Sequence, residues 1–289
     1  MYSAINFAGS TRGDGYNRPM TSIRAVVFDV GNTLWFQARS DIDRVYRLQA
    51  EAVAPLLERW GIRVGEPLLT ILDEIWQAGE AADRRERERG SLKEWPLQFF
   101  IRGALAARAV EISPEQAEAW HRAAWISETE FGVQLYPDTL DVLAALKEHG
   151  LLIGINTNRP CTAATHLPGL RDFGIAPYVD AVVCSGDTGF VKPHPSTFEL
   201  VLDRLGVSAS EAVMVGDTAP ADMRGAKSVG MRTVWKLNGR YGLPPCSDAD
   251  FTIHDLAELL ALPVIPGRAR QVMATESRTP HHDNNEDRY

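Results

Sequence analysis

Five short apolar runs, rich in β-branched residues, constrain the fold of this chain more than any other feature. None of them alternates between polar and apolar positions, as a strand exposed on one face would. Stretches with helical periodicity separate the runs, and this order is typical of a parallel sheet covered by helices. The sequence therefore predicts an α/β fold with a doubly wound, parallel, five-stranded sheet. The predicted strands are 23–29, 151–156, 181–185, 212–216 and 232–237.

The connection between the first two predicted strands is far longer than a simple crossover requires. It contains several amphipathic stretches and a capping-box start at Ser113. We therefore predict an α-helical cap domain at 37–135, inserted into an α/β core made of 22–36 and 136–263. Because the insert leaves and returns at one edge of the sheet, we expect it to cover the edge where such sheets bind ligands. Helices are predicted at 138–149, 195–205 and 220–229, each followed by a glycine.

Composition excludes several classes of partner. The chain has 289 residues, a net charge of −8 and 45% hydrophobic residues, so it has no basic surface for nucleic acid or an anionic membrane. Its 3 cysteines lack the spacing of a zinc site or a disulfide framework. No apolar run approaches the roughly 18 residues of a membrane span. We expect a soluble, cytoplasmic protein with a small-molecule partner, a flexible N-terminal extension at 1–21 and a disordered tail at 264–289.

Reactive side chains follow the predicted strands, where they should converge on one crevice. Three carboxylates in one crevice repel one another unless a divalent cation neutralises them. Oxygen ligands without histidine or cysteine select Mg²⁺, and a carboxylate beside Mg²⁺ can attack phosphorus. A lysine and a hydroxyl supply donors for phosphoryl oxygens. The carboxylates are Asp29, Asp217 and Asp222, and the donors are Lys192 and Thr157.

Four segments in this order resemble the motifs of the haloacid dehalogenase (HAD) superfamily. The segments are Asp29-Val30-Gly31-Asn32-Thr33, Ile155-Asn156-Thr157-Asn158, Lys192, and Gly216-Asp217-Thr218-Ala219-Pro220-Ala221-Asp222. The resemblance spans about residues 22–262 and implies a HAD-like Rossmannoid core with a helical cap.

The same resemblance implies a role for each matching residue. Asp29 is expected to be the nucleophile and a metal ligand, and the carbonyl of Gly31 a second ligand. Asp217 is expected to bind Mg²⁺ directly, with Asp222 supporting the metal or binding it through water. Thr157 and Lys192 are expected to hold the transferred group.

Gly31 is where the chain departs from the family pattern, because phosphatases of this superfamily usually have a second aspartate there. That aspartate protonates the leaving group, a step commonly worth about 10²–10⁴ in rate. We therefore expect a Mg²⁺-dependent phosphatase that acts on a small phosphorylated metabolite through an aspartyl-phosphate. The alternatives are a carbon–halogen hydrolase and a non-catalytic protein that binds a phospholigand. A phosphonatase would need a cap amine, for which Lys93 is the candidate.

Other residues have a structural interpretation. We expect Arg159 to be a surface guanidinium, Gly216 to permit a tight turn, and the charge run 83–89 to be a solvated helix face. Trp120 and Trp125 are expected in the cap core, although aromatic residues on a cap can line a pocket. The candidates to replace the missing acid are His121, Glu128 and His149.

Overall fold

The computed structural model describes residues 22–38, 41–240 and 242–266. The predicted extension at 1–21 and most of the predicted tail therefore lie outside the described residues. The beginning of the tail was predicted wrongly, because Val264 and Ile265 are buried against the core. Two apolar residues that follow a proline gave too little signal to mark them as packed.

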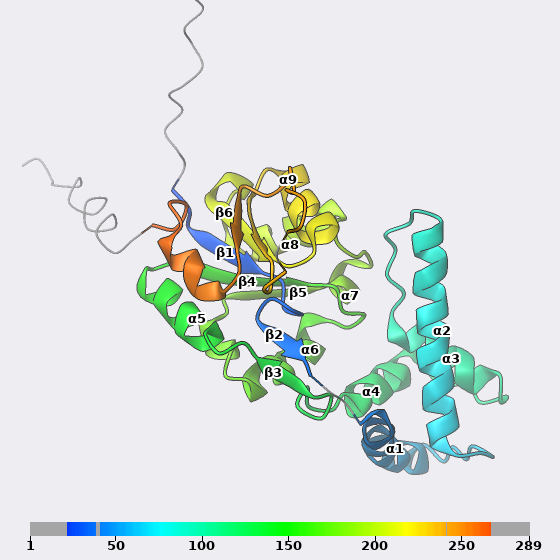
Figure 1. Ribbon diagram of the computed structural model, residues 1–289. Coiled ribbons are helices and arrows are strands. Elements are labelled where there is room, and N and C mark those ends of the chain that lie inside the picture. The colour runs from blue at the N-terminus through cyan, green and yellow to red at the C-terminus, as the bar shows by residue number, and fades with distance from the viewer. Residues whose placement is uncertain (1–21, 39–40, 241, 267–289) are drawn as a thin grey trace, which may run out of the picture.

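The central sheet has six parallel strands in the order β5-β4-β1-β6-β7-β8, which confirms the doubly wound α/β fold (Figure 1). The predicted number of five strands was wrong, because β8 pairs in parallel with β7 at the edge of the sheet. This strand has only three residues, and its middle residue, Thr252, is exposed, so it forms no apolar run. The strands are β1 (Ala25–Phe28), β4 (Leu152–Thr157), β5 (Ala181–Cys184), β6 (Ala212–Gly216), β7 (Arg232–Lys236) and β8 (Phe251–Ile253).

Helices cover both faces of this sheet. On one face, Val26 and Phe28 of β1 share a buried cluster with side chains of α5 (Thr139–Glu148) and α6 (Ala163–Asp172). On the other face, Ala25 and Val27 pack with α8 and α9. Successive side chains of β1 thus point into two different cores, which explains why its sequence does not alternate. The second pair of helices is α8 (Pro195–Leu205) and α9 (Arg224–Val229).

The predicted helix 220–229 is divided in the structure. Its first part is a π-helical segment, η3 (Ala219–Met223), which leads directly into α9. Short elements complete the described core: α7 (Ser185–Thr188), η1 (Ala176–Tyr178), η2 (Ala209–Glu211) and η4 (Leu256–Ala261).

Four helices lie in the predicted cap segment and form a unit beside the sheet (Figure 1). They share a buried cluster of their own, which includes Val53, Ile71, Ile101 and Trp120. The expectation that Trp120 belongs to the cap core is confirmed, since 1% of it is exposed. The domain boundaries themselves stay a prediction. The helices are α1 (Ile42–Arg59), α2 (Leu68–Glu88), α3 (Leu97–Ala106) and α4 (Pro114–Ala124).

Two features connect this unit to the core. The chain leaves and returns through an antiparallel strand pair, β2 (Trp35–Gln37) and β3 (Val133–Leu135), which the sequence did not predict. The loop between α2 and α3 also reaches the core, where the backbone N–H of Glu94 donates to the carbonyl of Gly189 at 2.8 Å. The Ser185 hydroxyl donates to the Glu94 carboxylate at 2.7 Å. The helical unit therefore contacts the loop that precedes Lys192.

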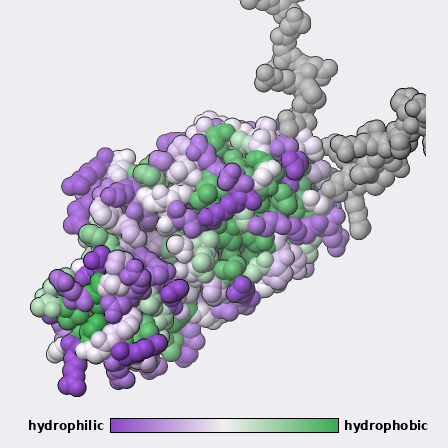
Figure 2. Space-filling view, turned by 180° about the vertical axis from the view of Figure 1, so that it is seen from behind, coloured by the Kyte–Doolittle hydropathy of each residue, from purple (hydrophilic) through white to green (hydrophobic). Residues whose placement is uncertain are grey.

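The end of α2 has a strongly polar surface. The charge run at 83–89 lies at the end of α2 with its arginines exposed, as expected for a solvated helix face. Figure 2, the view from behind, shows hydrophilic side chains spread over both parts of the molecule. None of the described helices is long and apolar enough to cross a membrane.

Candidate active site

The carboxyl ends of the central strands bring the predicted carboxylates together. Asp29 follows β1, Asp217 follows β6, and Asp222 lies in η3. One ligand atom from each of the three residues lies within 4.8 Å of the others. They come from two segments almost 190 positions apart in the chain, and the pairing of β1 with β6 places them side by side.

Asp29 is held in a fixed orientation at the end of β1. Its backbone N–H donates to the carbonyl of Val215 at 2.9 Å, which extends the hydrogen bonding between β1 and β6 by one residue. The Thr33 hydroxyl donates to Oδ2 of Asp29 at 3.2 Å, and Lys192 donates to Oδ1 at 2.7 Å. Only 8% of Asp29 is exposed, so its carboxylate faces the site rather than bulk solvent.

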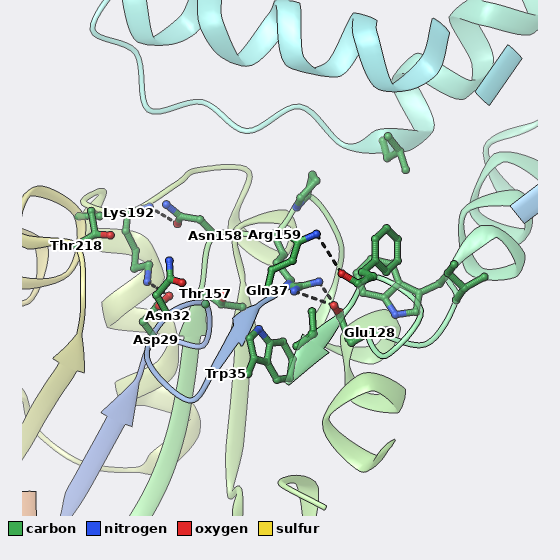
Figure 3. Close-up of a pocket in the computed structure, with 18 of the residues that line it drawn as sticks. Asp29, Asn32, Trp35, Gln37, Glu128, Thr157, Asn158, Arg159, Lys192 and Thr218 are labelled. Atoms are coloured by element: carbon green, nitrogen blue, oxygen red, sulfur yellow. Dashed lines mark hydrogen bonds and ion pairs between the residues drawn. The ribbon is translucent and has the colours of Figure 1, made fainter. Parts of the chain in front are cut away.

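Lys192 lies between two of the carboxylates. Its Nζ donates to Asp222 Oδ1 at 2.6 Å, as well as to Asp29 and to the backbone carbonyl of Asn156. Burial opposes the ammonium charge, but attraction by Asp222 and Asp29 outweighs it and raises the pKa of Lys192. The Asn158 side chain accepts a hydrogen bond from the backbone N–H of Lys192 at 2.8 Å, which fixes the lysine loop against the end of β4 (Figure 3).

Asp222 packs directly against the backbone at the end of β6. A Cβ at Gly216 would lie 2.4 Å from the Asp222 carboxylate, so only glycine leaves room for it. The expectation that Gly216 serves a tight turn was therefore wrong, and close approach of a side chain is the reason for the glycine. The Thr218 backbone N–H donates to Asp222 at 3.0 Å. Burial and the neighbouring Asp29 raise the pKa of Asp222, against the effect of Lys192.

Asp217 lies closer to solvent. Its carboxylate accepts a hydrogen bond from the Thr218 hydroxyl at 3.1 Å, and Arg240 lies 3.7 Å from its other oxygen. Burial and the nearby Asp29 raise the pKa of Asp217. The three carboxylates have one buried lysine and the half-exposed Arg240 as counter-charges, which leaves a net negative charge. A set of carboxylate oxygens without histidine or cysteine fits Mg²⁺.

Gly31 and Thr157 line the same cavity as the carboxylates. Thr157 is buried at the end of β4, with 4% exposed. Around Gly31 there is open space, because a Cβ at this position would meet no atom within 4 Å. The structure therefore brings together every residue predicted for the site. It shows no steric reason for the glycine at position 31.

The cavity extends well beyond the carboxylates and has a volume of about 610 Å³. Its far part is lined by residues from both the core and the helical unit, among them Trp35 of β2 and Trp125 at the end of α4. Of the two expectations for Trp125, the cap core or the wall of a pocket, the second is therefore confirmed. Figure 3 shows Asp29 and Lys192 at one end and Arg159 with Glu128 at the other, with Trp35 between them in this view.

Arg159 belongs to this cavity, and its prediction as a surface guanidinium was wrong. Its side chain is 24% exposed and forms two hydrogen bonds to Glu128, at 2.6 and 3.2 Å. The guanidinium carbon lies 5.4 Å from the Trp35 ring centre and 5.7 Å from that of Trp125. Its partners come from the loop after α4 and from β2, so the sequence around Arg159 held no signal of them.

Comparisons with known proteins identify the family. The haloacid dehalogenase-like hydrolase family matches residues 23–230. This chain belongs to the haloacid dehalogenase-like hydrolases. Among its relatives, a phosphoglycolate phosphatase of Rhodospirillum rubrum is 41% identical over 235 residues, covering 80% of this chain and 87% of that protein.

Two further relatives give the range of similarity. A ribulose-1,5-bisphosphate 5-phosphatase of Halopiger xanaduensis is 37% identical over 161 residues, which is 56% of this chain and 66% of the relative. This relative and two other phosphatases are matched over only 54% to 66% of their own length. The crystal structure of a 2-haloacid dehalogenase from Pseudomonas syringae is 26% identical, with a TM-score of 0.53, covering 83% of this chain and 97% of that one.

The candidates to replace the missing acid of this hydrolase have different surroundings. Glu128 is paired with Arg159, and Nδ1 of His121 accepts a hydrogen bond from the Gln98 amide at 3.2 Å. Burial lowers the pKa of His121, which favours its neutral form. His149 lies at the end of α5 and is not among the residues that line the cavity.

Lys93, the candidate amine for a phosphonatase, is also absent from the cavity lining. Its Nζ lies 3.6 Å from the ring centre of Trp95 on the α2–α3 loop. The described residues of this hydrolase therefore offer no lysine from the helical unit to the site, and the phosphonatase hypothesis gains no support.

Proposed function

We propose that this hydrolase is a Mg²⁺-dependent phosphatase in which Asp29 is the nucleophile. The observation that carries the proposal is the convergence of Asp29, Asp217 and Asp222, of which Lys192 pairs with Asp29 and Asp222. Such a site has more negative than positive charge until it binds a cation, and it then has the charge to hold a phosphoryl group. Relatives with the same family fold carry names of phosphatases.

Each residue has a chemical role in this proposal. The Asp29 carboxylate attacks phosphorus in line and forms an aspartyl-phosphate. Lys192 and Thr157 hold the oxygens of the transferred group. Asp29, the carbonyl of Gly31, Asp217 and Asp222 hold Mg²⁺, which lowers the repulsion between the carboxylate and the phosphoryl group when it is bound.

The proposed substrate is a small phosphorylated metabolite in the cytoplasm. Small phosphorylated compounds appear in the names of the relatives, as phosphoglycolate and ribulose-1,5-bisphosphate. The cavity of about 610 Å³ is in the usual size range of small-molecule pockets. The net charge of −8 supports neither nucleic acid nor an anionic membrane as a partner.

The direct test is release of inorganic phosphate from a panel of phosphate esters, with Mg²⁺ and with EDTA. The Asp29→Asn variant has a side chain of the same size without a nucleophilic carboxylate. Asp141→Asn, at an exposed position of α5, is the matched control. We expect Mg²⁺-dependent release that Asp29→Asn abolishes and Asp141→Asn retains. Release that persists in EDTA or in Asp29→Asn would contradict the proposal.

A carbon–halogen hydrolase is the second candidate, favoured by Gly31 and by the similarity to the 2-haloacid dehalogenase structure. The cluster of Asp29, Asp217 and Asp222 argues against it, because an aspartate that displaces a halide needs no metal. Halide release from a 2-haloacid in EDTA would decide for it. Binding of Mg²⁺ and orthovanadate without turnover of any substrate would instead indicate a non-catalytic phospholigand-binding protein.

A further inference from the structure

The far part of the cavity indicates what kind of group is attached to the phosphate. Beyond the carboxylates, its walls are formed mostly by aromatic and aliphatic side chains. A pocket lined in this way favours an apolar ligand, since burying polar groups without partners is costly. The apolar residues of this part include Trp35, Trp76, Trp125, Ile126, Phe131 and Val133.

The charges in this far part already compensate each other. Apart from the residues around Asp29, only Arg159 and Glu128 among the residues that line the cavity carry a charge. Their bidentate pair, with hydrogen bonds of 2.6 and 3.2 Å, uses the guanidinium for an internal contact. Glu128, of which only 3% is exposed, neutralises the guanidinium, so Arg159 offers little net positive charge to a carboxylate on the substrate. The cavity is therefore poorly suited to a leaving group with its own negative charge.

Gly31 adds an independent requirement on the chemistry of the leaving group. Without an acid at this position, the departing oxygen must leave as an anion. A phenolic oxygen has a pKa of about 10, whereas water has a pKa of 15.7 and simple alcohols are similar. A phenolate can therefore leave without a proton donor far more easily than an alkoxide.

From the aromatic walls, the internal ion pair and Gly31 together, we propose that the substrate is an aryl phosphate with an uncharged aromatic leaving group. This inference rests on the phosphatase function proposed above. The aromatic ring lies against the indole ring of Trp125, which is half-buried and lines the cavity, and its phosphate lies at Asp29. Contacts between aromatic rings are worth about 0.5–1.5 kcal/mol beyond the area that they bury.

The reaction balances with the residues of this chain and water. An oxygen of the Asp29 carboxylate forms a bond to phosphorus while the bond from phosphorus to the phenolic oxygen breaks. The phenolate leaves with the electron pair and takes a proton from solvent. Water then hydrolyses the aspartyl-phosphate, which restores the Asp29 carboxylate, releases inorganic phosphate and returns a proton to solvent.

The first experiment compares kcat/KM for four kinds of substrate in the presence of Mg²⁺. Phenyl and 1-naphthyl phosphate test the aromatic group, and glycerol 3-phosphate tests an alcohol. Phosphoglycolate tests a charged leaving group, and acetyl phosphate tests a good leaving group without a ring. We expect the aryl esters to exceed glycerol 3-phosphate by at least about 10²-fold, with phosphoglycolate the poorest.

Trp125→Leu and its control Trp95→Leu test the aromatic walls, and Glu128→Gln tests the ion pair. Trp125→Leu should lower the preference for 1-naphthyl over acetyl phosphate by about 2–12-fold, the loss of one ring contact. Trp95→Leu removes an indole of the helical unit that does not line the cavity, and it should keep the wild-type preference. Glu128→Gln frees Arg159, so it should raise the ratio of phosphoglycolate to phenyl phosphate hydrolysis by about tenfold or more. A gain of this kind cannot come from partial unfolding.

The outcomes separate the two proposals. If no substrate, including acetyl phosphate, gives release that requires Mg²⁺ and Asp29, both the phosphatase function and the aryl preference are wrong. If acetyl phosphate is hydrolysed but aryl esters are no better than glycerol 3-phosphate, or phosphoglycolate is the best substrate, only the aryl preference is wrong. An unchanged ring preference in Trp125→Leu also overturns it.

Discussion

The Nζ of Lys192 donates a hydrogen bond to Oδ1 of Asp29 at 2.7 Å, inside a cluster that contains two further carboxylates. The lysine is almost fully buried, with 4% exposed, so the carboxylates rather than water stabilise its charge. It is the one lysine among the residues that line the cavity. The same ammonium group therefore holds two buried carboxylates together and lies beside the proposed nucleophile.

Replacing Lys192 by methionine should destabilise the metal-free protein by about 3–5 kcal/mol, since it leaves two buried carboxylates without their partner. Phosphatase activity should fall by at least about 10²-fold, the usual cost of losing one charge-stabilising donor. Urea unfolding in EDTA and phosphate release measure the two effects. Lys147→Met is the control, because Lys147 pairs with Asp180 at the surface and should cost at most about 1 kcal/mol. Equal losses in both variants would contradict the assignment.

Gly31→Asp should be accommodated without strain, because a Cβ there meets no atom within 4 Å. The new carboxyl group would lie in the cavity beside Asp29 and could protonate the leaving group. We expect the rate with glycerol 3-phosphate to rise at least about tenfold, part of the 10²–10⁴ that a well-placed acid supplies. Phenyl phosphate should gain much less. Gly31→Asn is the matched control, because it has the same shape without an acidic proton. Equal rates in the two variants would show that the missing acid is not the limitation.

Much of the fold could be predicted because the sheet is buried on both faces. The side chains of Val26 and Val27 point into different cores, and this requirement leaves a continuous apolar run in the sequence. The edge strand β8 was missed because it has three residues, of which Thr252 is exposed and Phe251 only half-buried. The pair of β2 and β3 was missed because its two strands are distant in the chain and three residues long.

The carboxylate site could be predicted because each residue follows a strand whose end lies at one edge of the sheet. Asp29 and Asp217 needed only the order of the strands to be placed together. Arg159 and Glu128 could not be placed in this way, since Glu128 lies in an irregular loop after α4 whose path depends on the helical unit. The role of Gly216 was also hidden, because the packing of Asp222 against it appears only in three dimensions.

Asp217→Asn should have opposite effects with and without Mg²⁺. In EDTA the variant should unfold at a higher temperature than the wild type, since it removes one of three crowded carboxylates and since burial and Asp29 already disfavour the charge of Asp217. In Mg²⁺ the wild type should gain stability with metal concentration, and the variant should gain much less. Thermal unfolding over a Mg²⁺ titration measures this, with KCl at equal ionic strength as the control. Equal stabilisation of both proteins by Mg²⁺ would exclude Asp217 as a ligand.

His166 should make the protein sensitive to acid. It is fully buried, its ring lies against Trp35 and Trp125, and neither ring nitrogen has a hydrogen-bond partner among the described residues. The nearest Glu128 oxygen is 3.9 Å away, too far for a hydrogen bond. Burial, with a contribution from Arg159, lowers the pKa of His166 to about 3.

The sign of the effect follows from proton uptake. Between pH 6.5 and about 3, the unfolded chain binds a proton at His166 and the folded protein does not. The contribution of the neutral ring to the free energy of unfolding is complete above pH 6.5. It falls by about 1.4 kcal/mol for each pH unit below that value. His166→Phe removes this contribution without breaking a hydrogen bond, so its stability should fall less steeply between pH 7 and 5. Urea unfolding across this range measures the slope. Phe173→Leu, which alters another neighbour of Trp35, should lower stability equally at each pH, and parallel curves for His166→Phe and the wild type would show that His166 does not resist protonation.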